Sequence, residues 1–141
     1  MDSTTPSKGG QARSKSMSPA ERQFRKMNSH ARITAEVGVI SMTEDVDDSD
    51  GRRYRLKISS TPDGQHALAY CLRNPWDPVR PNAGRSYWDG HVDRDGFICL
   101  GNDSRRILAV SPFSLKFAVR RARYWCTGFS AYMEMGTFPN L

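Results

Sequence analysis

One cysteine, Cys99, stands in a setting that could support thiol chemistry. It belongs to the short apolar run at residues 97–100, which follows an Asp-Gly pair and is closed by a Gly-Asn pair. Such pairs favour turns, so the run is predicted to be a brief strand that carries the thiol. A free cysteine is most often a small buried hydrophobic residue, but this placement makes Cys99 a candidate nucleophile.

The other two cysteines are predicted to be core residues. Cys71 lies inside a predicted strand, and Cys126 lies on the apolar stripe of a predicted helix. Neither is a candidate nucleophile. Three cysteines, odd in number and widely separated, fit a reducing compartment better than a disulfide framework.

His91 precedes Cys99 and has three interpretations. It could assist the chemistry of the thiol, or it could be a loop histidine without a special role. The spacing of His91 and Asp93 is also typical of the first half of a non-haem iron site, but no second histidine follows it. A cysteine protease would need a base close to the thiol, and His66 or His91 would serve only if the fold brought it there.

The stretch before His91 is predicted to be a long ordered loop. Its start, Asn-Pro-Trp-Asp-Pro at residues 74–78, is a rigid turn because each proline fixes its own backbone angle and restricts the residue before it. The proline and glycine residues that follow must wrap over a surface, and loops of this length are often functional. Trp76 and Trp88 are predicted to anchor the loop by filling the space beneath it.

This layout resembles that of the ubiquitin-conjugating enzymes. In that family a Tyr-Pro-Phe-x-Pro-Pro turn is followed by a long flap, by His-Pro-Asn and by Gly-x-Ile-Cys-Leu. Residues 74–78, 89–91 and 96–100 fall on these three motifs without a gap, and about a fifth of the chain carries the resemblance. Bacterial members are more similar, because they tolerate His at the Asn position and often read Ile-Cys-Leu-Gly-Asn, which is the run at residues 98–102 here.

The resemblance implies a bacterial ubiquitin-conjugating-like enzyme. Cys99 would accept the C-terminus of a ubiquitin-like protein from an activating enzyme as a thioester, and would pass it to an amine of a target protein. His91, in place of the family's Asn, would donate a hydrogen bond to the oxyanion. Asn102 or Asp103 would orient the amine, and no metal or other cofactor is implied. The residues in the position where the family meets its activating enzyme are Arg22, Arg25 and Lys26.

The resemblance also sets the wider expectations. A removing protease encoded in the same operon and a role in antiviral defence are implied by analogy with bacterial relatives. The chain ends about forty residues past Cys99, so the family's last helices are expected to be shortened or absent. A noncatalytic protein of the same fold, which only holds a ubiquitin-like partner, is an alternative.

The first elements follow from local signals. Residues 1–17 are polar and basic, and are predicted to be a disordered tail. A helix is predicted from Pro19 to about Ala31, with Ser18 as its cap and Glu21 as the other half of a capping box. Residues 32–43 are rich in Ile and Val and predict a strand, possibly broken at Gly38.

The middle of the chain predicts an antiparallel meander. The acidic residues 45–51 could converge on calcium, but the glycine falls one position late and no closing glutamate follows, so a solvated hairpin tip is favoured. Residues 53–59 alternate between apolar and basic side chains, which predicts a strand with one buried face. A Thr-Pro-Asp-Gly turn leads to the return strand at residues 66–72.

The last predicted element is a long helix that begins with Ser111 as its cap and continues to about Met133. Lys116, Arg120 and Arg123 are predicted on its outer face. Its apolar stripe, with steps of three and four residues, consists of Leu115, Ala118, Val119, Ala122, Trp125, Cys126, Phe129 and Met133.

Together these elements predict a small α+β protein with a UBC-like domain at residues 18–141: an N-terminal helix, a meander of about four strands, an active-site flap and a long C-terminal helix. No run of residues is long and apolar enough for a membrane span, so a cytoplasmic protein is expected. The net charge of +6 supports a rival class, a nucleic-acid-binding protein, but no known binding motif accompanies it. The arginines of that alternative are Arg105, Arg106, Arg120, Arg121 and Arg123.

Overall fold

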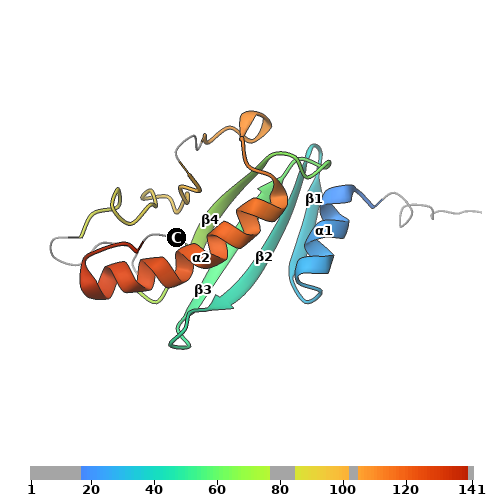
Figure 1. Ribbon diagram of the computed structural model, residues 1–141. Coiled ribbons are helices and arrows are strands. Elements are labelled where there is room, and N and C mark those ends of the chain that lie inside the picture. The colour runs from blue at the N-terminus through green and yellow to red at the C-terminus, as the bar shows by residue number, and fades with distance from the viewer. Residues whose placement is uncertain (1–16, 77–84, 102–104, 140–141) are drawn as a thin grey trace, which may run out of the picture.

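The computed structural model describes residues 17–76, 85–101 and 105–139. A four-stranded antiparallel sheet, in the order β1-β2-β3-β4, forms its centre, and helix α2 crosses one face of the sheet (Figure 1). The predicted α+β class, N-terminal helix, antiparallel sheet and C-terminal helix are confirmed. Residues 1–16 of the predicted tail lie outside the described residues. The elements are α1 (Pro19–Met27), β1 (Arg32–Glu36), β2 (Val39–Asp47), β3 (Arg53–Ser60), β4 (Ala67–Arg73), the short 3-10 helix Leu108–Val110 and α2 (Leu115–Met135).

Helix α1 begins as its sequence predicts. The Ser18 hydroxyl accepts a hydrogen bond from the Glu21 N–H at 3.1 Å, and Pro19 occupies the first helical position. The helix ends at Met27 rather than near Ala31, because Asn28 has an extended backbone and its side chain accepts a hydrogen bond from a later N–H group. The prediction of the helix end was therefore wrong.

The predicted strand at residues 32–43 is divided into β1 and the first part of β2. Gly38 has a φ of 76°, which allows a tight turn, and Glu36 pairs with Val39 across it. Of the hairpin tip predicted at residues 45–51, residues 45–47 continue β2, and the turn that joins β2 to β3 lies at residues 48–52. Asp45 forms an ion pair at 2.9 Å with Arg55, its cross-strand neighbour in β3.

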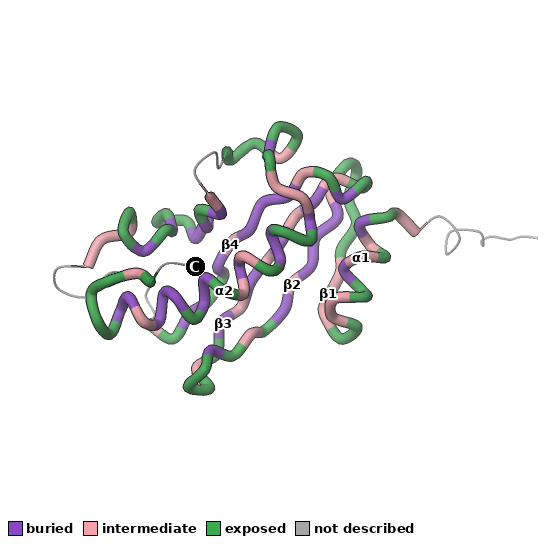
Figure 2. The backbone as a smooth tube through the Cα atoms, viewed as in Figure 1, coloured by how far each residue is buried: buried purple, intermediate pink, exposed green. Residues whose placement is uncertain are grey.

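The core lies between the sheet and α2. Tyr54, Leu56 and Ile58 alternate along β3 and are fully buried, and every residue of the predicted apolar stripe of α2 is buried as well. Figure 2 shows buried positions along the inner strands and along α2. Periodicity in the sequence therefore predicted both sides of this interface correctly.

Helix α2 starts later than predicted. Ser114 is its cap and accepts a hydrogen bond from the Phe117 N–H at 3.3 Å. Ser111 is not the cap, because its hydroxyl donates to the Ala67 carbonyl at 2.6 Å, which ties the chain to the start of β4. Among the described residues, no helix has the length and apolar character needed to cross a membrane.

One buried carboxylate joins three elements. Glu44 of β2 accepts hydrogen bonds from Arg123 of α2 at 2.7 and 2.8 Å, and from Asn28 at the end of α1 at 2.9 Å. The Glu44 side chain is 1% exposed, so this charge depends on its partners. The prediction that Arg123 lies on the outer face of the helix was wrong, because its guanidinium turns inward to Glu44.

Candidate functional site

Strand β4 supports the cysteine segment, residues 85–101, on one side. The Cys71 N–H donates to the Gly96 carbonyl at 2.8 Å, and Tyr70 forms an isolated bridge with Phe97. A Cβ at Gly96 would collide with the Cys71 carbonyl oxygen, and its φ of 91° bends the chain at this point. The segment therefore turns beside β4 instead of extending along it, and the predicted strand at residues 97–100 is reduced to isolated bridges.

Helix α2 supports the other side of the cysteine segment. The indole N–H of Trp125 donates to the Gly90 carbonyl at 2.8 Å, and the Tyr132 hydroxyl donates to the Ser86 carbonyl at 2.9 Å. A Cβ at Gly90 would lie 3.0 Å from the Phe129 ring, so glycine permits this close approach to the helix. The cysteine segment is thus held between a strand and a helix of the core.

Cys99 is the exposed thiol of the chain, and the other two cysteines are buried. Its N–H donates to the His91 carbonyl at 2.9 Å, and its Sγ lies 3.4 Å from the Gly101 carbonyl. Burial raises the pKa of the Cys71 thiol to about 11, and burial also raises the pKa of Cys126. The assignment of Cys71 and Cys126 to the core is confirmed, and Cys99 is the thiol that a reagent can reach.

His91 adopts the left-handed backbone conformation, with a φ of 58°. Its N–H donates to the Trp88 carbonyl at 3.1 Å, and its ring packs edge-to-face against Phe138 with 4.6 Å between the centroids. A non-glycine residue with positive φ costs free energy and is often found at functional sites. The structure thus joins His91 and Cys99 through a backbone hydrogen bond, and the oxyanion role of the imidazole stays a prediction.

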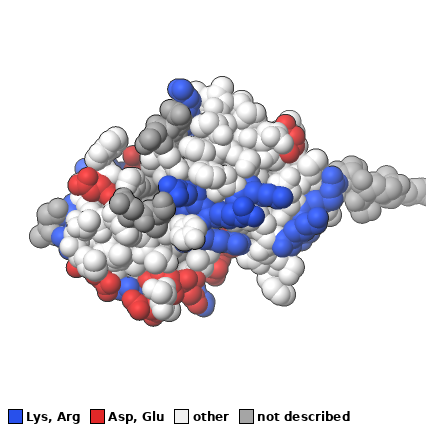
Figure 3. All heavy atoms as spheres, viewed as in Figure 1, with Lys and Arg blue, Asp and Glu red and all other residues white. Residues whose placement is uncertain are grey.

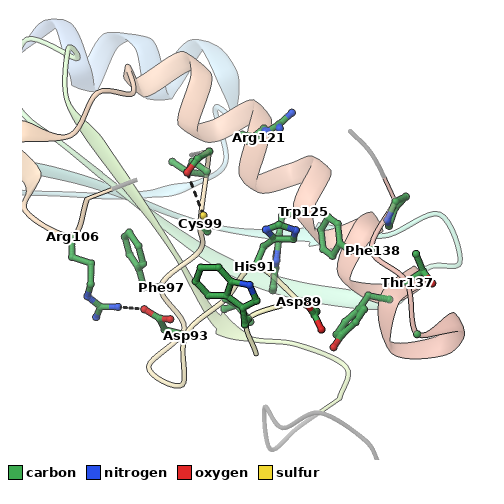
Figure 4. Close-up of a pocket in the computed structure, with 17 residues that line it drawn as sticks. Asp89, His91, Asp93, Phe97, Cys99, Arg106, Arg121, Trp125, Thr137 and Phe138 are labelled. Carbon is green, nitrogen blue, oxygen red and sulfur yellow. Dashed lines mark hydrogen bonds and ion pairs between the residues drawn. The ribbon is translucent and has the colours of Figure 1, made fainter. Parts of the chain in front are cut away.

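A groove of about 980 Å³ opens beside the thiol (Figure 4). Cys99 lines the groove, and Arg121 on α2 lies above the thiol in this view. Phe138 and Thr137 lie farther along the groove. The His91 ring faces the same groove. Its other principal lining side chains are Trp88, Asp89, Asp93, Phe97, Arg106, Trp125 and Tyr132.

Arg106 connects the chain after Cys99 to the chain before it. Its guanidinium forms ion pairs with Asp93, at 2.5 Å, and with Asp95, and lies 4.7 Å from the centroid of the Phe97 ring. This clamp was not predicted, because two aspartates and a distant arginine carry no recognisable spacing. Its charge is therefore balanced locally and is not free for a polyanion.

The basic residues predicted to meet an activating enzyme lie on the outer surface of α1. Arg22, Arg25 and Lys26 are exposed, and Arg25 forms an ion pair with Glu21 at 3.4 Å. Figure 3 shows Lys and Arg side chains gathered over α1 and α2 on one face of the molecule. The predicted orienting residues, Asn102 and Asp103, lie outside the described residues.

The rival set of nucleic-acid-binding arginines is divided by the structure. Arg106 and Arg123 are ion-paired, whereas Arg105 and Arg120 are exposed. Arg121 lines the thiol groove and lies 5.9 Å from the ring centroid of Phe117. Only part of the predicted set is therefore available to a nucleic acid.

Two aromatic residues of the groove were not predicted in their observed positions. Trp88 is 88% exposed, so the prediction that it fills the space beneath the loop was wrong. Phe138 follows the end of α2 and folds back over Gly128. The available signal was Gly136, whose φ of 87° reverses the chain after the helix.

Within the described ranges, no group of three or more His, Cys, Asp and Glu side chains could hold a metal ion. Comparison of the chain with models of protein families, with characterised proteins and with solved structures found no match of any kind. The functional argument therefore depends on the geometry of the groove and on the sequence motifs.

Proposed function

We propose that this protein carries a ubiquitin-like protein as a thioester on Cys99 and transfers it to an amine of a target protein. The observation that carries the proposal is an exposed thiol that lines a groove and is held on a segment between β4 and α2. The order of elements, with a helix, a meander, the thiol segment and a helix across the sheet, is the order that the resemblance to ubiquitin-conjugating enzymes implies. The bacterial type is favoured by the Ile-Cys-Leu-Gly-Asn run.

The proposed reaction consists of two acyl transfers. First, the Cys99 thiolate attacks the carbonyl carbon of a thioester on the activating enzyme; the new C–S bond forms and the enzyme's thiol leaves. Second, a target amine attacks the same carbon, a C–N bond forms, the bond to Sγ breaks, and the thiol regains a proton. No redox step is involved. His91 would donate to the oxyanion that develops in both steps.

The partners of the proposal are a ubiquitin-like protein, an activating enzyme and a target protein. The exposed basic surface of α1, formed by Arg22, Arg25 and Lys26, would meet the activating enzyme. Asn102 or Asp103 would orient the target amine. A removing protease and a role in antiviral defence belong to the same proposal by resemblance, as does a cytoplasmic location.

The decisive experiment is an intact-mass measurement on the Cys99→Lys variant, recovered from its natural cells. A lysine would convert the transient thioester into a stable amide. We expect an added mass of the size of a ubiquitin-like protein, and fragmentation would identify that partner. The matched control is Cys99→Ala, which should carry no adduct.

The opposite result would change the assignment. If Cys99→Lys carries no adduct in cells that contain the activating enzyme, the protein would be a noncatalytic binding module of the same fold. Unaltered biology after loss of Cys99 would support that alternative. A salt-dependent nucleic-acid-binding assay would then test the basic residues of α2, with Arg120→Ala as the variant.

A further inference from the structure

Trp88 is exposed on a backbone that is held in place. The Trp88 carbonyl accepts a hydrogen bond from the His91 N–H at 3.1 Å, and the next N–H, of Asp89, donates to the Ser86 hydroxyl at 3.0 Å. Large exposed aromatic residues on fixed backbones are typical of contact surfaces, because they bury much area at little cost in conformational entropy. The position of Trp88 at the thiol groove indicates what it would contact.

The groove lining includes aromatic rings as well as polar side chains. The indole N–H of Trp125 is occupied by the Gly90 carbonyl, and the Tyr132 hydroxyl is occupied by the backbone of Ser86. Both side chains line the groove but are buried, at 2% exposure, whereas the Phe138 ring is half-buried and is the aromatic lining that an occupant can reach beside Trp88. An apolar side chain that packs against Trp88 and Phe138 would be removed from water without leaving a polar group unpaired.

The charges of the lining also cancel. Two arginines, Arg106 and Arg121, and two aspartates, Asp89 and Asp93, line the groove, which gives a formal sum of zero. Arg106 already pairs with Asp93. A neutral segment is therefore the complementary occupant, since a charged side chain would meet no net opposite charge.

We propose that Trp88 selects acyl donors whose C-terminal tail carries an aromatic or large aliphatic side chain close to its last residue. This inference rests on the proposed function. The terminal carbonyl carbon of the donor is bonded to Sγ in the thioester, so the residues before it leave the thiol along the groove that Cys99 lines. There the apolar side chain packs against the exposed Trp88 indole.

The test uses a defined probe instead of the unidentified donor. Acetylated peptides Ala-X-Ala-Gly, prepared as thioesters of 2-mercaptoethanesulfonate, acylate Cys99 as its thiolate displaces the mercaptan. Intact mass gives the initial rate for X = Phe, Leu, Ala and Glu. We expect Phe to react about tenfold faster than Ala and Glu to be slowest, which is the size of effect that one well-placed aromatic contact produces.

Variants assign that preference to Trp88. In Trp88→Ala the rates for Phe and Ala should agree within about twofold, and Trp88→Phe should keep most of the preference. The matched control is Tyr124→Ala, because Tyr124 is also an exposed aromatic, at 62%, but does not line the groove. It should behave as the wild type does.

Two different failures are distinguishable. Acylation of wild-type Cys99 at a rate independent of X, or a preference that survives in Trp88→Ala, overturns the inference and leaves the acyl-carrier function intact. The inference is also overturned if X has no effect in the donor peptides but does affect the rate at which amine peptides accept the acyl group from Cys99. No acylation by any peptide, although iodoacetamide labels Cys99, overturns the proposed function together with this inference.

Discussion

The helix–sheet body and the cysteine segment are stabilised by different means. In the body, strand ladders and a buried core hold the sheet and α2 together, and the Glu44 carboxylate is buried in its ion pair with Arg123. In the cysteine segment, Val92, Ile98 and Leu100 reach the core, but single hydrogen bonds and an exposed ion pair hold the chain around them. The body thus supplies rigidity. The segment keeps Cys99, His91 and Trp88 accessible, and its exposed part is therefore stabilised by fewer contacts.

The three cysteines make this contrast measurable. At pH 8, iodoacetamide should alkylate Cys99 in the native protein at least about a hundredfold faster than Cys71, because the Cys71 thiol, whose burial raises its pKa to about 11, is ionised in roughly one molecule in a thousand and must also be uncovered. Timed labelling followed by peptide mass spectrometry would give both rates. In urea the three cysteines should react alike. Comparable native rates for Cys71 and Cys99 would contradict the difference between the two regions.

The buried ion pair predicts the next largest effect. Arg123→Ala should lower the free energy of unfolding by about 3 kcal/mol, because it leaves the Glu44 carboxylate buried without its main partner. Urea denaturation followed by tryptophan fluorescence would measure this loss. Arg120→Ala, an exposed position on the same helix, is the control and should change stability by less than about 0.5 kcal/mol. Equal effects of the two variants would show that the buried Glu44 carboxylate does not depend on Arg123.

The body was largely predictable from the sequence, since its signals are periodic or local. The alternation along β3, the stripe of α2 and the Ser18 cap all gave the observed structure. The errors fall where tertiary contacts override a local signal. Ser111 and Ser114 are equally good helix caps by type, and the bond from Ser111 to β4 decides between them.

The cysteine segment was predictable only as a motif. The sequence located Cys99 and placed His91 near it, but the run at residues 97–100 has the composition of a strand without a neighbour along its full length. The Arg106 clamp and the fold-back of Phe138 depend on contacts between distant residues, and no periodic pattern encodes them. The burial of Trp88 was predicted wrongly. Tryptophan is highly buried on average, but the residue type alone does not show whether the fold provides a site for it.

Acid should affect the body more than the cysteine segment. Burial raises the pKa of Asp48, but hydrogen bonds from Ser130 and from the backbone of Arg52 and Asp50 lower it by more, so the pKa lies below its ordinary value of 3.8. The carboxylate therefore stabilises the fold above that value, and this contribution is lost as the pH falls below it, through the folded-state pKa. Urea titrations of Asp48→Asn and wild type should differ at pH 7 and converge as the pH falls below 3.8.

Asp95 supplies the comparison for that experiment. Its pKa is also lowered, by the hydrogen bond from Arg106, but it lies on the exposed cysteine segment. Asp95→Asn should therefore change the stability at pH 7 much less than Asp48→Asn does. If Asp95→Asn proved the more damaging, the exposed clamp would be part of the cooperative fold.

The smallest effect on stability is expected from Arg106→Ala. The Arg106 side chain is 46% exposed, and exposed ion pairs contribute about 0–1 kcal/mol, so the free energy of unfolding should barely change. The clamp nevertheless connects the chain on both sides of Cys99, and its loss should loosen that segment alone. Amide hydrogen exchange should become several-fold faster at Gly96 and Cys99 and stay unchanged along α2. Faster exchange along α2 as well would mean that the thiol segment and the body unfold as one unit, and that the groove owes its shape to the whole fold.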